Sequence, residues 1–127
     1  MPIRVALLIP GALIAGVLLT SCAGPTRKSA SALTGGDPAR GAARIPQYGC
    51  GACHSIPGIP GAHGIVGPPL AGLGARMYVG GVLPNQPENA VLWIRNPKSV
   101  NQRTAMPNVG VTERDATDIV TYLYSLK

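Results

Sequence analysis

Near its C-terminal end the chain places apolar residues at helical intervals. Thr112 is suited to cap the N-terminus of this helix, and acidic residues follow in the first turn, where the helix dipole favours negative charge. One face of the predicted helix carries Ala116, Ile119, Val120 and Leu123, followed by Tyr124 or Leu126. We expect this stripe to pack into the core, because its spacing matches one side of a helix.

Two further helices are predicted from their terminal residues. Asp37 followed by Pro38 matches an N-cap and a first helical position, so a helix is expected over 39–48, kinked or shortened by Pro46. A second helix is expected over 87–96, where Pro97 ends it. Residues 98–102 are mostly polar and are expected to form a connector.

The remaining segments are expected to be long loops. Residues 55–69 are dense in proline and glycine, and no stretch of the chain alternates with the period of a strand. The pattern therefore predicts one small all-α domain over 37–127.

Few large apolar side chains are available to fill the core of this domain. The chain has no phenylalanine, one tryptophan and four tyrosines, against 17 glycines and 13 prolines. A domain of this size has little core of its own. A buried cofactor would supply the missing apolar volume, and loops rich in glycine and proline suit wrapping around one.

Residues 50–54 form a C-x-x-C-H motif, which is the attachment motif of a c-type haem. Cys50 and Cys53 would form thioethers with the haem vinyl groups, and His54 would bind the iron. A redox pair would leave His54 without a role. A zinc site would need two more ligands, and the chain offers only Cys22 and His63.

Met106 is the candidate for the second axial ligand of the iron. It precedes Pro107, which restricts it to extended geometry, in a polar loop between two predicted helices. The alternatives are that Met106 fills a gap in the core, or that Met77 is the ligand. An iron bound by His54 and Met106 has no open position for a substrate, so we expect electron transfer and no catalysis.

The first 36 residues have a different pattern from the domain. Residues 1–4 carry one positive charge, and residues 5–19 form an apolar run that is long for a secretory signal and short for a membrane span. The run ends in Leu19-Thr20-Ser21-Cys22, which resembles the lipobox of bacterial lipoproteins. In that class the signal is cut before the cysteine, whose thiol carries diacylglycerol.

We therefore expect a lipoprotein signal peptide over 1–21, and a lipidated Cys22 with a flexible tether over 22–36. The tether is predicted because the segment is rich in small and polar residues without apolar periodicity. The alternatives are an ordinary signal peptide with an incidental cysteine, and an uncleaved anchor helix. A lipid anchor would hold the domain on the periplasmic side of a bacterial membrane, inner or outer.

The formal net charge is +6 and stays positive after loss of Arg4. An exported chain rarely meets nucleic acid, so no nucleic-acid partner is expected. An acidic docking face on a redox partner, or anionic lipid near the tether, fits this charge better.

The motifs of the domain follow one another in the order found in class I c-type cytochromes, which residues 37–127 resemble. The segments that carry this resemblance are 50–54, 67–70, 96–97, 104–107 and 118–123. A closer likeness, carried by residues 80–89 and 93–97, is to the cytochrome c domain fused to subunit II of some haem-copper oxidases. Because no copper-binding domain accompanies it in this sequence, we expect a free-standing relative.

The resemblance implies a small cytochrome c fold, with helices and long loops around one covalently attached haem. It further implies that the carbonyl of Pro68 accepts a hydrogen bond from His54, and that Arg76 and Thr104 lie near the propionates. Trp93 would lie beside the methionine sulfur. Ile45 replaces a usual aromatic in the first helix, which makes the packing of that helix against Tyr122 and Leu123 a point to test.

These inferences predict a membrane-tethered, monomeric electron carrier with a single haem. The expected donor is a quinol–cytochrome c reductase or a periplasmic dehydrogenase, and the expected acceptor is a haem-copper oxidase. The alternatives are a haem subunit of a larger oxidoreductase complex, and a gas-binding sensor from which Met106 dissociates. His63, between Ala62 and Gly64, is expected to be a loop residue. The alternative is that it binds a second metal or the haem.

Overall fold

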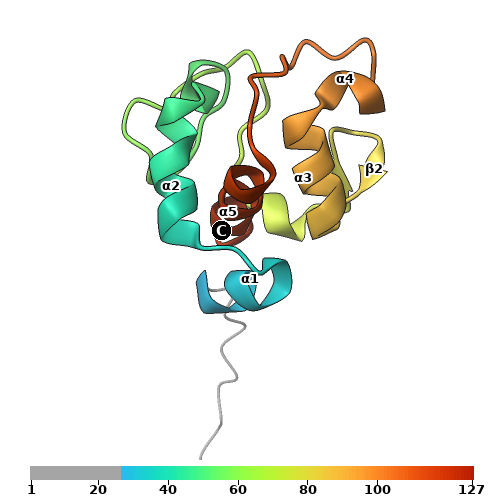
Figure 1. Cartoon of the computed structure of the whole chain (residues 1–127). Helices are drawn as coiled ribbons and strands as arrows, with labels where there is room; N and C mark the ends of the chain where they lie inside the picture. The colour runs from blue at the N-terminus through green and yellow to red at the C-terminus, as the bar shows by residue number, and fades with distance from the viewer. Residues whose placement is uncertain (1–26) are drawn as a thin grey trace, which may run out of the picture.

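Helix α5 lies at the centre of the structure, and the other helices are arranged around it (Figure 1). The computed structural model describes residues 27–127. Its elements are α1 (Arg27–Thr34), α2 (Pro38–Gln47), the 3-10 turns η1 (Cys50–Ala52) and η2 (Leu73–Ala75), β1 (Tyr78–Val79), β2 (Leu83–Pro84), α3 (Pro87–Arg95), α4 (Pro97–Val100) and α5 (Glu113–Tyr124). The predicted all-α class is confirmed.

The predicted apolar stripe of α5 forms the core. Ala116, Ile119, Val120 and Leu123 are all buried, and they pack with residues from the helices around them. The hydroxyl of Thr112 accepts a hydrogen bond from the backbone N–H of Asp115 and caps the helix as predicted. The stripe continues into Tyr124, which is buried, whereas Leu126 is only partly buried.

Helices α2 and α5 approach each other closely. A Cβ atom on Gly41 would lie 2.0 Å from the backbone oxygen of Asp118, so only glycine fits at this contact. Ile45, one turn further along α2, has no solvent exposure. An aliphatic residue therefore fills the position where class I c-type cytochromes usually have an aromatic. Pro46 lies in the last turn, and the helix ends one residue later at Gln47.

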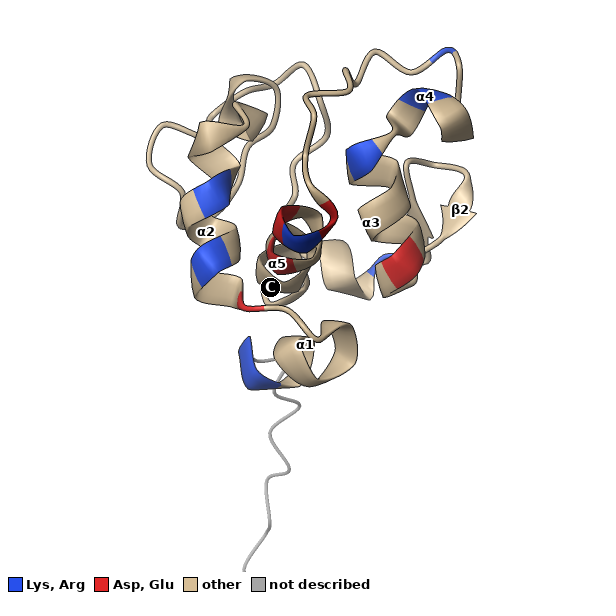
Figure 2. Cartoon of the chain, in the orientation of Figure 1, with Lys and Arg blue, Asp and Glu red and all other residues tan. Residues whose placement is uncertain are grey.

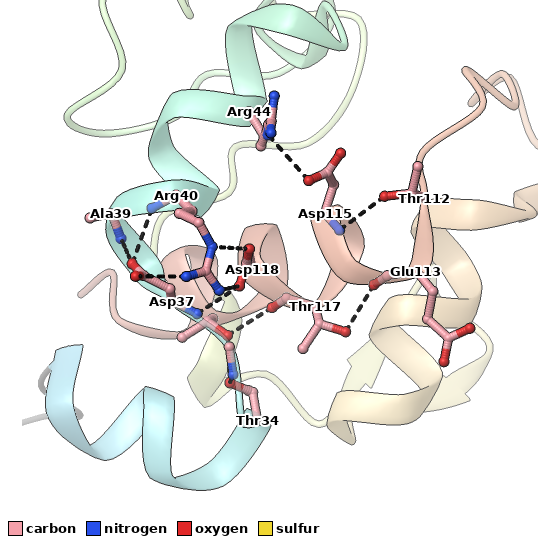
Figure 3. Close-up of polar contacts among 12 residues, drawn as sticks. Thr34, Asp37, Ala39, Arg40, Arg44, Thr112, Glu113, Asp115, Thr117 and Asp118 are labelled. Atoms are coloured by element: carbon pink, nitrogen blue, oxygen red, sulfur yellow. Dashed lines mark hydrogen bonds and ion pairs between the residues drawn. The ribbon is translucent and has the colours of Figure 1, made fainter.

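Ion pairs join the exposed side of α2 to α5 (Figure 3). Arg40 donates to Asp118 through Nε at 2.8 Å and through Nη2 at 2.9 Å, and the backbone N–H of Asp37 donates to the same carboxylate at 2.7 Å. Burial opposes ionisation of Asp118, but these three hydrogen bonds outweigh it and lower its pKa. Asp37 also caps α2 by accepting from two backbone N–H groups, as predicted.

The prediction of a flexible tether over residues 22–36 is wrong for residues 27–34. Residues 27–34 form α1, which packs against α5 through the buried Ala30. Thr34 shares a hydrogen bond with Thr121, and a Cβ on Gly36 would collide with the same hydroxyl. Small residues allow α1 and α5 to approach this closely. Only one residue of α1 is buried, so its sequence has no apolar stripe that would indicate a helix. The folded unit therefore begins before residue 37, and residues 1–26, with the predicted signal peptide and Cys22, lie outside the described part.

Two smaller elements also differ from the prediction. The connector expected over 98–102 begins as the one-turn helix α4, whose first residue, Pro97, is suited to a helix start. A short hairpin pairs Tyr78 with Pro84 and Val79 with Leu83, and strands of two residues are too short for alternation to reveal. Within the described residues, no helix has the length and apolar character needed to cross a membrane.

Candidate cofactor site

A cavity of about 600 Å³ lies among α2, α3, α5 and the loops that join them. Its walls are mostly apolar, and they include Ile45, Leu73, Val79, Ile94, Ile119 and Leu123. All eight residues predicted to bind the cofactor line this cavity: Cys50, Cys53, His54, Pro68, Arg76, Trp93, Thr104 and Met106. The fold thus brings together residues that are up to 56 positions apart in the sequence.

The C-x-x-C-H motif forms a tight turn directly after α2. Gly49 begins the turn with φ of 69°, a left-handed conformation that favours glycine, and the backbone N–H of His54 donates to the carbonyl of Cys50 at 3.0 Å. Both cysteines lie on the cavity wall and form no disulfide with each other. Burial raises the pKa of the Cys50 thiol, which is the opposite of what activates a redox cysteine.

A zinc centre has equally little support. No group of three or more His, Cys, Asp or Glu side chains among residues 27–127 is placed to hold a metal ion. His63 is exposed, pairs with Ser55 in an isolated bridge and does not line the main cavity, so it is a loop residue in this fold.

The imidazole of His54 is fixed by the loop that faces it. Its Nδ1 lies 2.7 Å from the carbonyl oxygen of Pro68, the hydrogen bond that the resemblance implied. A proton on Nδ1 that is donated to this carbonyl leaves Nε2 with a free lone pair, as metal ligation requires. Gly67 makes the arrangement possible, because a Cβ there would lie 2.3 Å from Cε1 of His54.

Met106 reaches the cavity from a different segment, the loop between α4 and α5. Its backbone N–H donates to the hydroxyl of Thr104 at 3.2 Å, and the loop is closed at its start by a hydrogen bond from the Thr104 N–H to the Asn101 carbonyl. Met77 is 79% exposed and does not line the cavity. Among the described residues, Met106 is thus the methionine that lines this cavity.

The supporting residues hold the cavity walls in place. The guanidinium of Arg76 donates to the carbonyls of Pro69 and Ala71, and so ties the hairpin segment to the loop beyond Pro68. Trp93 packs against the turn of the hairpin, where a Cβ on Gly80 would lie 2.5 Å from the indole ring. The approach of Arg76 and Thr104 to the propionates stays a prediction.

Two polar contacts around the cavity were missed from the sequence. Tyr48 lines the cavity, and its hydroxyl donates to Asp115 at 2.7 Å, which together with Arg44 lowers the pKa of that carboxyl. Asn85 donates to the carbonyls of Leu73 and Arg76 and accepts from the hydroxyl of Tyr124. Burial raises the pKa of Tyr124 to about 12. Each contact joins residues far apart in the chain, so local pattern gives no signal for it.

The donor set and the shape of the cavity fit a c-type haem. The volume lies in the range of roughly 300–1,000 Å³ that is usual for cofactor pockets. Its apolar walls suit a flat hydrophobic ring, and two thiols, an imidazole and a thioether all reach it.

Comparisons with known proteins agree with this geometry. The family model described as cytochrome c matches residues 38–127. A cytochrome c oxidase subunit 2 from Alkalihalophilus pseudofirmus is 37% identical over 79 residues, which are 61% of this chain and 22% of that protein. The chain thus spans less than a quarter of the length of this curated relative.

Proposed function

This chain belongs to the cytochrome c family, as a class I c-type cytochrome with a covalently attached haem that carries electrons, and from that premise we propose a membrane-tethered carrier with His54 and Met106 as axial ligands. The observation that supports this proposal most directly is the hydrogen bond from His54 to Pro68, on a cavity that Met106 also lines. When bound, the haem supplies an iron that takes up and releases one electron.

The residues of the chain limit the structural rearrangement that accompanies electron exchange. Cys50 and Cys53 hold the cofactor covalently, and Pro68 fixes the orientation of the His54 ring and increases its basicity. The thioether of Met106 would bind the iron of a bound haem and raise its reduction potential. Apolar walls keep water out, so little rearrangement accompanies the change in charge.

The substitution Met106→Ala tests the ligation. We expect the oxidised protein to lose the absorbance band of methionine–iron ligation, carbon monoxide to bind faster, and the potential to fall. Met77→Ala is the matched control, because Met77 is exposed outside the cavity and should leave all three unchanged. If Met77→Ala has these effects and Met106→Ala does not, the assignment is wrong.

The tether is proposed to be a lipid at Cys22 on the periplasmic side of a bacterial membrane. The lipobox-like residues 19–22 support it. Mass spectrometry of the mature protein should give a chain that begins at a modified Cys22. An unmodified chain cleaved elsewhere, or one that retains residue 1, would contradict the proposal.

A quinol–cytochrome c reductase or a periplasmic dehydrogenase is proposed as the donor, and a haem-copper oxidase as the acceptor. The similarity to a cytochrome c oxidase subunit 2 supports the acceptor. It also favours a second function, a haem subunit held permanently in an oxidoreductase complex. Gentle purification from native membranes separates the two, since a carrier is isolated alone and a subunit is isolated with its complex.

A further inference from the structure

Helix α1 is docked on the rest of the domain. Ala30 is 2% exposed, and Thr34 is bonded to Thr121 of α5. The guanidinium of Arg27 lies 5.9 Å from the centre of the Tyr122 ring, at the very start of the described chain. The tether that the sequence suggested is therefore anchored to the domain from residue 27 onward.

Little chain remains between this helix and the proposed attachment point. Four residues separate Cys22 from Arg27. Even fully extended, five residue steps span only about 18 Å. An uncleaved apolar segment over residues 5–19 would also end close to α1. In either case the membrane surface lies near α1.

The surface of α1 suits an anionic bilayer. Arg27, Lys28 and Leu33 are exposed, and neither basic residue has an ion-pair partner within residues 27–127. The carboxylate nearest in sequence, Asp37, is paired with Arg40 and caps α2. Figure 2 shows basic residues at the start of α1.

The C-x-x-C-H motif lies at the opposite end of α2 from α1 (Figure 1). Helix α2 has ten residues, which is about 15 Å of helix, and η1 follows directly beyond it. A membrane that touches α1 is therefore separated from the attachment motif by the length of the domain.

We infer that α1 is the face of the domain that rests on the anionic bilayer surface, so that the Cys50–Cys53 edge of the cavity points away from the membrane. This inference rests on the proposed attachment before α1. The short link limits the distance between the domain and the membrane. The basic residues determine which face of the domain contacts the lipid. Because α1 is docked on α5, this contact also fixes the orientation of the cavity. The edge is then presented to partners that project from the membrane, and not to the lipid.

Energy transfer from a fluorophore on lipid headgroups to the haem tests the orientation. The mature holo-protein, purified from its own membranes, is incorporated into vesicles of phosphatidylcholine with phosphatidylglycerol, and into vesicles of phosphatidylcholine alone. We expect weaker quenching on the anionic vesicles, because the haem is held away from the surface there. Arg27→Glu with Lys28→Glu should remove the difference, shifting the ratio of docked to undocked domains by roughly tenfold or more.

Lys98→Glu with Arg103→Glu is the matched control, since it changes the charge equally at the other end of the molecule and should keep the difference. Unchanged visible spectra and unfolding temperatures show that the variants are folded.

The orienting role of α1 is overturned if the wild type is quenched equally on both kinds of vesicle. It is also overturned if the control pair loses the difference in quenching as the Arg27 and Lys28 pair does. Neither outcome affects the proposed attachment. A mature chain without lipid or apolar segment, shown by its mass, overturns the attachment and the orientation together.

Discussion

The imidazole of His54 is held by two neighbours that leave it almost no freedom. Pro68 accepts its hydrogen bond, and Gly67 leaves room for the ring. Cys50, His54 and Met106 could be predicted as cofactor-binding residues from the sequence, because short local motifs identify their chemistry. Tyr48 was missed, because its partner Asp115 is 67 positions away and no local pattern connects the two.

The contact between Gly67 and His54 gives a prediction at the residue scale. Gly67→Ala should push the imidazole off the Pro68 carbonyl, because the new Cβ would lie 2.6 Å from Nδ1. We expect a shifted potential and a weakened methionine–iron band, measured by redox titration and absorbance. Gly74→Ala is the control, since its Cβ would crowd the backbone of Tyr124 and not His54, and Gly74 does not line the cavity. If both variants change the spectrum equally, the effect comes from general crowding.

At the scale of elements, the helices that carry strong terminal signals were predicted and the one without them was not. Asp37 with Pro38, Pro87 with Pro97, and Thr112 mark α2, α3 and α5 at positions that the structure confirms within a residue or so. Helix α1 has neither an apolar stripe nor an acidic first turn. Its existence depends on α5, which supplies the surface that Ala30 and Thr34 contact.

The crossing of α2 over α5 should not tolerate a side chain at Gly41. Gly41→Ala is expected to lower the free energy of unfolding by about 1–3 kcal/mol, because overpacking outweighs the better helix propensity of alanine. Urea unfolding of the holo-protein measures it. Ala43→Gly, on the exposed side of the same helix, should cost no more than about 1 kcal/mol. A Gly41→Ala protein as stable as the wild type would show that the two backbones can separate without cost.

The ion pair between α2 and α5 predicts a dependence of stability on pH. The pKa of Asp118 is lower in the folded protein than in the unfolded chain, so its contribution is complete above the unfolded value and is lost as pH falls towards the folded one. Asp118→Asn should therefore cost about 1–3 kcal/mol at neutral pH, and less below about pH 4. Chemical unfolding at several pH values tests this, with Glu113→Gln as the exposed control. A cost that stays constant down to low pH would exclude a role for the charge.

On the scale of the whole molecule, positive charge gathers away from the centre. Figure 2 shows basic residues at the end of α3, on α4 and on the loop beyond it, namely Arg95, Lys98 and Arg103. Arg95 is paired with Glu113, whereas Lys98 and Arg103 have no ion-pair partner within the described chain. The guanidinium of Arg76 is bonded to the carbonyls of Pro69 and Ala71.

This distribution predicts that charge steers transfer to an acidic partner. The rate should fall steeply with added salt, because the screening length is only ~8 Å at physiological ionic strength. Lys98→Glu should slow the bimolecular rate at low salt by roughly 3- to 10-fold, and Arg114→Glu on α5 should slow it less. Stopped-flow mixing with the partner measures both, with thermal unfolding as a check on folding. A rate that ignores salt would favour apolar docking or a permanent complex.

The central position of α5 also determines when the core of the domain can form during synthesis. Helices α1 and α2 are made before α5, yet the surface that buries Ala30, Gly41 and Ile45 belongs to α5, the last helix of the described chain. A growing chain emerges N-terminus first. Until α5 has appeared, the thiols of Cys50 and Cys53 lie in a chain with no core to enclose them. The same topology that seals the cavity in the finished protein keeps the attachment motif accessible while the chain is still being made.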